Sequence, residues 1–329
     1  MKCKMKVLMC LFSLFGFTVI AEESKIDEDA MFACIAELSR HTEDNVSIGD
    51  LKKQCRKDIN NPIAKRNLLE KNASSNPFAI LPHKPNYILP VTYFKANENP
   101  YKGVLQGYNL DDIEAKFQVS LKYAITRNAF IDDLNIYAAF TATSYWQSYN
   151  ADISAVFRET NYEPELILSY NAPWSLFGLT IDNSSLSFNH QSNGQAGELS
   201  RSWNRIIGGL TVVDDNVIWN LKAWYRVPEE EKSIANGPAG DDNPNIENYM
   251  GYGELGVLWK VTHGHNIDLM LRNNLKSENK GAIQLGWSFP LTSHLRGYVE
   301  YFNGYGESLI YYNEKVSRFG IGVKLTDWL

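Results

Sequence analysis

After its first 21 residues, the sequence lacks a long hydrophobic run. No later stretch approaches the roughly 20 consecutive apolar residues that a membrane-spanning helix needs, although 44% of the 329 residues are hydrophobic. A bundle of transmembrane helices is therefore excluded for the remainder of the chain. The length is sufficient for one large core or one large closed barrel, and it does not require more than one main domain.

The sequence is also poor in positive charge. It carries 32 Lys and Arg against 38 Asp and Glu, a formal net charge of −6. The first 21 residues hold three lysines and no acidic residue, so the rest of the chain is more acidic still. A chain of this charge is a poor partner for nucleic acid, because it would be repelled by the phosphates.

Residues 1–21 have the features of a secretory signal peptide. Three lysines precede an apolar run from Val7 to Ile20, and Val19 and Ala21 provide small residues before Glu22. This order of basic, apolar and small residues is typical of a cleaved export signal. We exclude the segment from the fold and expect the mature chain to be exported.

Cysteine is scarce beyond the signal peptide, where only Cys34 and Cys55 remain. In an oxidising compartment such a pair is expected to form a disulfide. Two thiols with only His41 nearby do not complete a tetrahedral metal site. Because apolar residues around both cysteines recur at helical spacing, we expect residues 22–60 to form a disulfide-stapled helical hairpin. Residues 61–85, rich in Asn, Ser and Pro, are expected to be a linker.

From residue 86 to the end, apolar and polar residues alternate. In the stretch IEAKFQVSLKYAI (113–125), apolar residues take every second position, and nearly all the positions between are polar. This period of two is typical of β-strands. Turn-forming stretches separate about twelve such segments. They begin near residues 86, 113, 134, 162, 178, 201, 217, 249, 265, 279, 294 and 316.

A soluble sandwich and a membrane barrel both alternate in this way. Three features favour the barrel. The segments are about ten residues long, which is the length that crosses a bilayer at a tilt. Charged residues occur throughout the second face, and aromatic residues lie at segment ends, as in Tyr145-Trp146 and Tyr301-Phe302. An open sheet edge would leave backbone groups unpaired in lipid. We therefore predict an all-β fold, a twelve-stranded antiparallel transmembrane β-barrel over residues 86–329, in an outer membrane.

Three polar residues lie at the ends of two neighbouring predicted strands, on the face that should contact lipid. His190 and Ser192 share the parity of Phe188, and Asn204 shares the parity of Ile206. A nucleophile, a base and an orienting group would thus converge outside the barrel. The alternative is that they are ordinary polar residues of the membrane interface. A β-bulge near Ser187 or Asn189 would also reverse their direction.

Several stretches of the sequence resemble the outer-membrane phospholipase A family of Gram-negative bacteria. They are NHQSNG (189–194), SRSWNR (200–205), FRETNYEPEL (157–166), DDNPNIENYMGY (241–252) and GYGESLIYYN (304–313). The resemblance covers residues from about 113 to the C-terminus. It implies a twelve-stranded barrel and a calcium-dependent serine hydrolase that acts on the sn-1 and sn-2 acyl esters of phospholipids and lysophospholipids.

The same resemblance implies roles for particular residues. Carried over by motif position, Ser192 is the nucleophile, His190 the base and Asn204 the residue that orients the base. The family is active as a homodimer, which binds Ca²⁺ between its subunits.

For the metal, the resemblance implies the Ser200 hydroxyl, the backbone carbonyl of residue 195 and Ser154 of the partner subunit. Gln195 stands where the family has a basic residue, which spares a main-chain ligand. Ala142 stands where an outward polar residue contributes to the dimer, and this implies a weaker or differently packed dimer. The alternative from another class is a non-catalytic outer-membrane pore or structural barrel, which would need no polar group on its lipid face.

Overall fold

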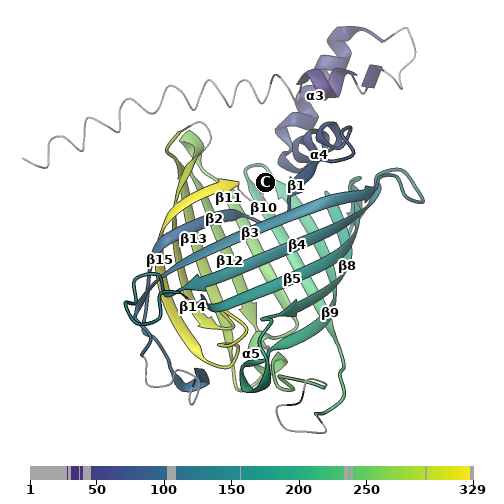
Figure 1. The fold of residues 1–329 in the computed structure, drawn as a ribbon. Coiled ribbons are helices and arrows are strands. Elements are labelled where there is room, and N and C mark those ends of the chain that lie inside the picture. Colours follow the sequence, from purple (N-terminus) through teal and green to yellow (C-terminus); the bar gives the residue numbers. More distant parts are fainter. Residues whose placement is uncertain are drawn as a thin grey trace, which may run out of the picture.

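The structure is a computed structural model, which describes residues 28, 31–36, 38–39, 46–101, 109–155, 157–232, 237, 240–292 and 295–326. The predicted signal peptide lies outside the described residues. The centre of the molecule is a closed barrel of twelve antiparallel strands (Figure 1). Neighbours in the chain are neighbours in the sheet, and β15 pairs with β2 to close it.

The barrel strands lie close to where the alternation predicted them. They are β2 (Asn86–Phe94), β3 (Ile113–Thr126), β4 (Leu134–Trp146), β5 (Phe157–Tyr170), β8 (Asn183–Ser192), β9 (Ser202–Asp214), β10 (Val217–Val227), β11 (Gly253–Lys260), β12 (Asn266–Asn273), β13 (Gly281–Pro290), β14 (Arg296–Tyr305) and β15 (Lys315–Thr326).

The segment expected to begin near residue 178 begins later, at Asn183, because the chain first makes a small hairpin. Strands β6 (Trp174–Leu176) and β7 (Leu179–Ile181) pair around Phe177 and Gly178, both of which have positive φ. Two such residues form the tight turn that suits a two-residue hairpin. The strand expected near residue 162 begins earlier, at Phe157. The start of its alternation is obscured by polar residues, because Arg158, Glu159 and Asn161 are buried at the barrel end.

A helix occupies the stretch that we expected to be a linker. Helix α4 (Pro62–Ala73) follows α3 (Ile48–Asn60), and the Asn61 side chain accepts hydrogen bonds from the backbone N–H groups of Ile63 and Ala64. An Asn cap followed by Pro in the first turn is a strong helix start, and the linker interpretation overlooked it. The predicted disulfide between Cys34 and Cys55 is present and ties α3 to the preceding segment.

Helix α4 lies at the end of the barrel where β2 begins and β15 ends (Figure 1). Glu70 forms an ion pair with Lys122 of β3 at 2.9 Å, and Asn61 Nδ2 donates to Asp182 at 2.6 Å. The short strand β1 (Ile80–Pro82) pairs with β3 on the way to the barrel. Other short helices include η1 (Asn99–Tyr101), η2 (Gly197–Leu199), α5 (Glu247–Met250) and η3 (Thr262–Gly264). Among the described residues, no helix has the length and apolarity to cross a membrane.

The two faces of the wall follow the alternation. On β8, Phe188 is 51% exposed while its neighbour Asn189 is completely buried. Several buried charges inside the barrel form ion pairs, among them Glu114 with Arg158 at 2.7 Å and Lys116 with Glu300 at 2.6 Å. An apolar exterior around a polar, ion-paired interior is the reverse of a soluble protein, and it is the arrangement that a bilayer requires.

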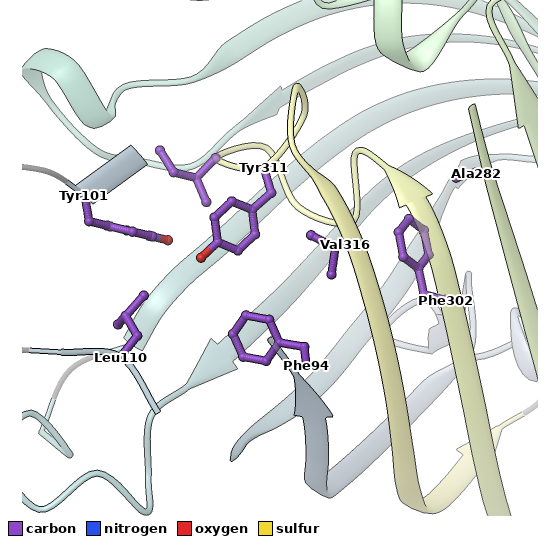
Figure 2. Packing of buried hydrophobic residues seen from close by; sticks show 8 residues of the cluster. Phe94, Tyr101, Leu110, Ala282, Phe302, Tyr311 and Val316 are labelled. Atoms are coloured by element: carbon purple, nitrogen blue, oxygen red, sulfur yellow. The ribbon is translucent and has the colours of Figure 1, made fainter. Parts of the chain in front are cut away.

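Apolar side chains fill the barrel at the end opposite α4. There the loop 306–314 folds inward and contributes to two clusters. The first, shown in Figure 2, consists of Phe94, Tyr101, Leu110, Ala282, Phe302, Ile310, Tyr311 and Val316. The second consists of Trp203, Ile207, Trp224, Ile246, Met250, Leu309 and Tyr312. Between these clusters and α4, charged residues line an internal cavity of about 470 Å³.

The buried pair Glu114–Arg158 provides a test of this interior. Neither side chain has any exposed area, and Arg318 also contacts Glu114 at 2.8 Å. Glu114→Gln should lower the free energy of unfolding by about 3–5 kcal/mol, because it leaves the buried Arg158 guanidinium without its counter-ion. Arg318 keeps its second ion pair, to Glu307. Urea unfolding in lipid vesicles measures this change. Glu278→Gln is the control, since Glu278 is 89% exposed in its pair with Lys280. Equal midpoints for the two variants would contradict the prediction.

Candidate active site

His190, Ser192 and Asn204 lie on the outer face of the wall, as their parity predicted. His190 and Ser192 end strand β8, and Asn204 begins β9. Strands β8 and β9 keep one register over the whole of β8, with His190 opposite Asn204 and Ser192 opposite Ser202. No bulge interrupts β8, so the alternation continues unbroken from the exposed Phe188 to Ser192.

A hydrogen bond joins two of these residues. Nδ1 of His190 lies 2.8 Å from Oδ1 of Asn204. Directly opposed residues in an antiparallel pair bring their side chains together, so the strand register alone accounts for this contact. In the part of the chain that the structure describes, no hydrogen bond links Ser192 to His190. Ser192 is two residues along the same face, next to Tyr162 of β5 in the register.

Sequence reasoning missed a fourth polar residue at this point. The Asn204 amide, through Nδ2, donates to Oε1 of Glu229 at 3.0 Å. Glu229 follows the end of β10, whose last residue, Val227, pairs with Asn204. A Glu in a loop 25 positions away gives no signal in the sequence. Only the register of β9 and β10 brings it to this place.

The loop after Ser192 is held from inside the barrel. Asn193 has the opposite parity, is buried, and accepts hydrogen bonds through Oδ1 from the N–H groups of Gln195 (3.3 Å) and Arg201 (3.0 Å). Its Nδ2 donates to the Leu199 carbonyl at 2.8 Å and to Glu159 at 3.3 Å. Asn193 therefore fixes both ends of the loop that begins at the predicted nucleophile.

Ser200 and Ser202 share one acceptor. Their hydroxyls donate to Oδ2 of Asp242 at 2.8 Å and 3.2 Å, and Asp242 also pairs with Lys232. Burial raises the pKa of Asp242, but Lys232 and the two hydroxyls outweigh this effect and hold the pKa below its ordinary value. The carboxylate is thus ionised at neutral pH, and it anchors the loop 193–201 to the loop after β10.

Among the described residues, no hydrogen bond joins any two of the three predicted calcium ligands. Gln195 is exposed, and no described N–H group donates to its carbonyl. Ser154 is exposed in the loop between β4 and β5, where its carbonyl accepts from Trp146 Nε1 at 2.8 Å. Across the described ranges, no three His, Cys, Asp or Glu residues cluster as a metal site. The candidate ligands are neutral oxygens instead.

An open apolar surface surrounds the polar group. Leu166, Phe188 and Ile206 lie side by side in the register of β5, β8 and β9, and all three are exposed. They form the row next to His190 and Asn204 in the direction of the bilayer. The internal cavity lies on the other side of the wall, where Gln191 and Arg205 line it.

A closed antiparallel barrel with an apolar exterior and an ion-paired interior defines the chain as an outer-membrane β-barrel protein. Comparison with known proteins then identifies its family. The model of the phospholipase A1 family matches residues 63–325, so the chain belongs to that family and is an outer-membrane phospholipase. The match begins at helix α4, well before the segment near residue 113 where the resemblance was seen.

Curated relatives agree with this assignment. Phospholipase A1 of Klebsiella pneumoniae is 36% identical over 261 residues, which cover 79% of this chain and 86% of that protein. Phospholipase A1 of Escherichia coli K12 is 34% identical over 262 residues, with the same coverage of each chain.

Solved structures give the same fold. Outer membrane phospholipase A from Escherichia coli, solved as an asparagine-to-alanine active-site mutant, is 34% identical with a TM-score of 0.70; the match covers 77% of this chain and 94% of that one. The Salmonella typhi outer membrane phospholipase, a dimer with bound calcium, is 33% identical with the same score and coverage.

The anchor at Asp242 can be tested by proteolysis. Asp242→Asn removes the ion pair to Lys232 and weakens the hydrogen bonds from Ser200 and Ser202. Hydrogen bonds to a charged group contribute about 1.5–3 kcal/mol, so local opening should rise roughly tenfold or more. Tryptic cleavage after Arg201 and Lys232 should accelerate accordingly at pH 8, where Asp242 is ionised. Glu231→Gln, at an exposed neighbouring position, should cleave at the original rate; an unchanged rate for Asp242→Asn would refute the anchoring role.

Proposed function

We propose that this phospholipase cleaves the acyl esters of phospholipids and lysophospholipids on the lipid-facing wall, with Ser192 as nucleophile, His190 as base and Asn204 orienting the base. The observation that carries this proposal is the 2.8 Å contact between His190 and Asn204 on an otherwise apolar exterior. The asparagine active-site mutant of the Escherichia coli protein supports a role for an Asn in this family.

The reaction follows from these positions. Ser192 Oγ attacks the acyl carbonyl carbon while His190 Nε2 takes the hydroxyl proton. The tetrahedral intermediate then expels the glycerol oxygen, which receives that proton from His190. Water next hydrolyses the acyl-enzyme with His190 again as base, and this frees the fatty acid. The bond between nucleophile and base is often long in a resting enzyme and shortens when substrate binds.

The exposed row of Leu166, Phe188 and Ile206 provides the acyl-chain contact. A lipid held against this wall places its ester at the height of His190 and Ser192, which lie at the end of the strand. Because this wall is open and does not enclose an acyl chain, it does not select between the two acyl chains of the lipid. We therefore include both sn-1 and sn-2 esters among the substrates.

Ca²⁺ fits the oxygen ligands present. Ser200 donates its proton to Asp242, which leaves the lone pairs of its oxygen for a cation, and the Gln195 carbonyl is free of described donors. Calcium accepts such hydroxyl and carbonyl oxygens together with water. We assign Ser200, Gln195 and Ser154 of the partner subunit as ligands. When bound, the metal supplies positive charge that polarises the ester carbonyl.

We further propose that dimerisation activates the enzyme, because the calcium site as assigned is complete only with Ser154 of the partner subunit. The calcium-bound dimer of the Salmonella typhi relative supports this assembly. In the register of β4, β5 and β8, Ala142 lies opposite Tyr162, which lies opposite Ser192. A small apolar residue at this point of the face offers no hydrogen bond to a second copy, so we expect a weak dimer.

The pore alternative is not favoured. The two apolar clusters fill the end of the barrel opposite α4, and Glu70 of α4 pairs with Lys122 at the other end. A polar pair on the lipid face would also have no purpose in a passive barrel.

Replacement of the nucleophile is the decisive test. Ser192→Ala should lower fatty-acid release from mixed phospholipid micelles by about a thousandfold or more, while the barrel keeps its heat-modifiable mobility on electrophoresis. Ser185→Ala, on the inward face of the same strand, is the matched control and should retain activity. Substantial lipolysis by Ser192→Ala would show that the nucleophile is another residue.

Removal of the metal gives a second test. A calcium chelator should abolish fatty-acid release, and Ca²⁺ should restore it, whereas Mg²⁺ should not, because Mg²⁺ requires a tighter octahedral shell. Ser200→Ala should raise the half-maximal Ca²⁺ concentration by about tenfold, the effect of losing about 1.4 kcal/mol of binding. Full activity in chelator would exclude the calcium requirement.

A further inference from the structure

Glu229 is placed behind the predicted third member of the triad. It lies in the loop after β10, is half-buried, and accepts the 3.0 Å hydrogen bond from Asn204 Nδ2. We propose that Glu229 is a positioning residue that fixes the Asn204 amide and, through it, the proton on His190. This inference rests on the proposed function of the site.

The side-chain amide of Asn204 could face its neighbours in either of two orientations. Asn can present either its carbonyl or its NH₂ group to a neighbour, whereas an ionised carboxylate can only accept hydrogen bonds. Because Glu229 accepts, the NH₂ group of Asn204 must face it. The carbonyl of Asn204 is then the group that faces His190 Nδ1, as observed.

The tautomer of His190 follows. An acceptor beside Nδ1 requires the ring proton on Nδ1, and this leaves Nε2 unprotonated. Nε2 is the atom that must take the proton of Ser192. If the amide were reversed, its NH₂ group would favour the proton on Nε2, and His190 could not act as the base. In a Ser-His-Asp triad the aspartate, which can only accept a hydrogen bond, itself keeps the proton on Nδ1. Here Glu229 keeps it there by fixing the orientation of Asn204.

The charge of Glu229 is available for this role. Asn204 Nδ2 is the one hydrogen-bond donor to this carboxylate among the described contacts, and no described cation forms an ion pair with it. By contrast, two nearby carboxylates are in ion pairs: Asp241 with Arg226, and Asp242 with Lys232. The Glu229 carboxylate therefore remains an acceptor for the amide.

The first variant is Glu229→Gln. Gln presents either end of its own amide, so both orientations of Asn204 become possible. We expect kcat to fall by roughly tenfold and KM to stay within about twofold, because a positioning residue acts on Asn204 and not on lipid binding. Labelling of Ser192 by a fluorophosphonate should slow by a similar factor. Glu231→Gln, two residues further in the loop and exposed, should match the unmodified enzyme in both assays.

The second step repeats Glu229→Gln in the Asn204→Asp background. Asn204→Asp alone sets two carboxylates against each other and should be impaired. In the Asn204→Asp background, the Glu229→Gln substitution supplies an NH₂ group to the new carboxylate. The double variant should therefore be more active than Asn204→Asp alone. The effect of Glu229→Gln thus reverses its sign between the two backgrounds.

The outcomes are separable. A residue that merely supports the loop would lower activity in both backgrounds, and this result would overturn the inference. Equal activity of Glu229→Gln and Glu231→Gln, with Ser192→Ala inactive, would also overturn it while leaving the proposed function intact. Activity or labelling that survives Ser192→Ala would instead refute the proposed function itself. Heat-modifiable mobility identifies the folded variants to be compared.

Discussion

Backbone hydrogen bonding in hydrocarbon is the constraint on which the whole structure depends. Every N–H and C=O group within the bilayer must find a partner in the protein, because no water is present to supply one. The pairing of β15 with β2 meets this requirement by closing the sheet. In the closed wall, as in any β-strand, successive side chains point to opposite sides. A polar side chain that faces outward must therefore find its partners on the wall, as His190 does in Asn204 and Asn204 in Glu229.

The same alternation lets the interior support the site. Ser192 faces outward, so Asn193 must face inward, where its buried amide binds both ends of the loop 193–201 and reaches Glu159. The polar interior is thus not only a means of burying charges. Through a single inward residue, it determines the course of the loop that carries two of the proposed calcium ligands, Gln195 and Ser200.

Much of this arrangement could be predicted from the sequence because a period of two is a strong signal when repeated twelve times. It gave the barrel, the approximate strand positions and the outward direction of His190, Ser192 and Asn204. Helix α4 could not be recognised in this way, since it is short and its apolar residues follow no clear face; the Asn61–Pro62 cap was the available signal. Glu229 and Asp242 could not be assigned either. Their contacts depend on how the loop after β10 folds back, and alternation says nothing about loops.

The apolar plug has a consequence for the membrane as a barrier. A barrel of twelve strands encloses a lumen, and an enzyme with the proposed site on its outer wall has no use for an open lumen. With Phe302, Tyr311 and their neighbours packed across the end of that lumen, the protein can reside among the lipids without becoming a route for small solutes. The cell can therefore hold a lipid-degrading enzyme in its outer membrane without making that membrane more permeable to small solutes.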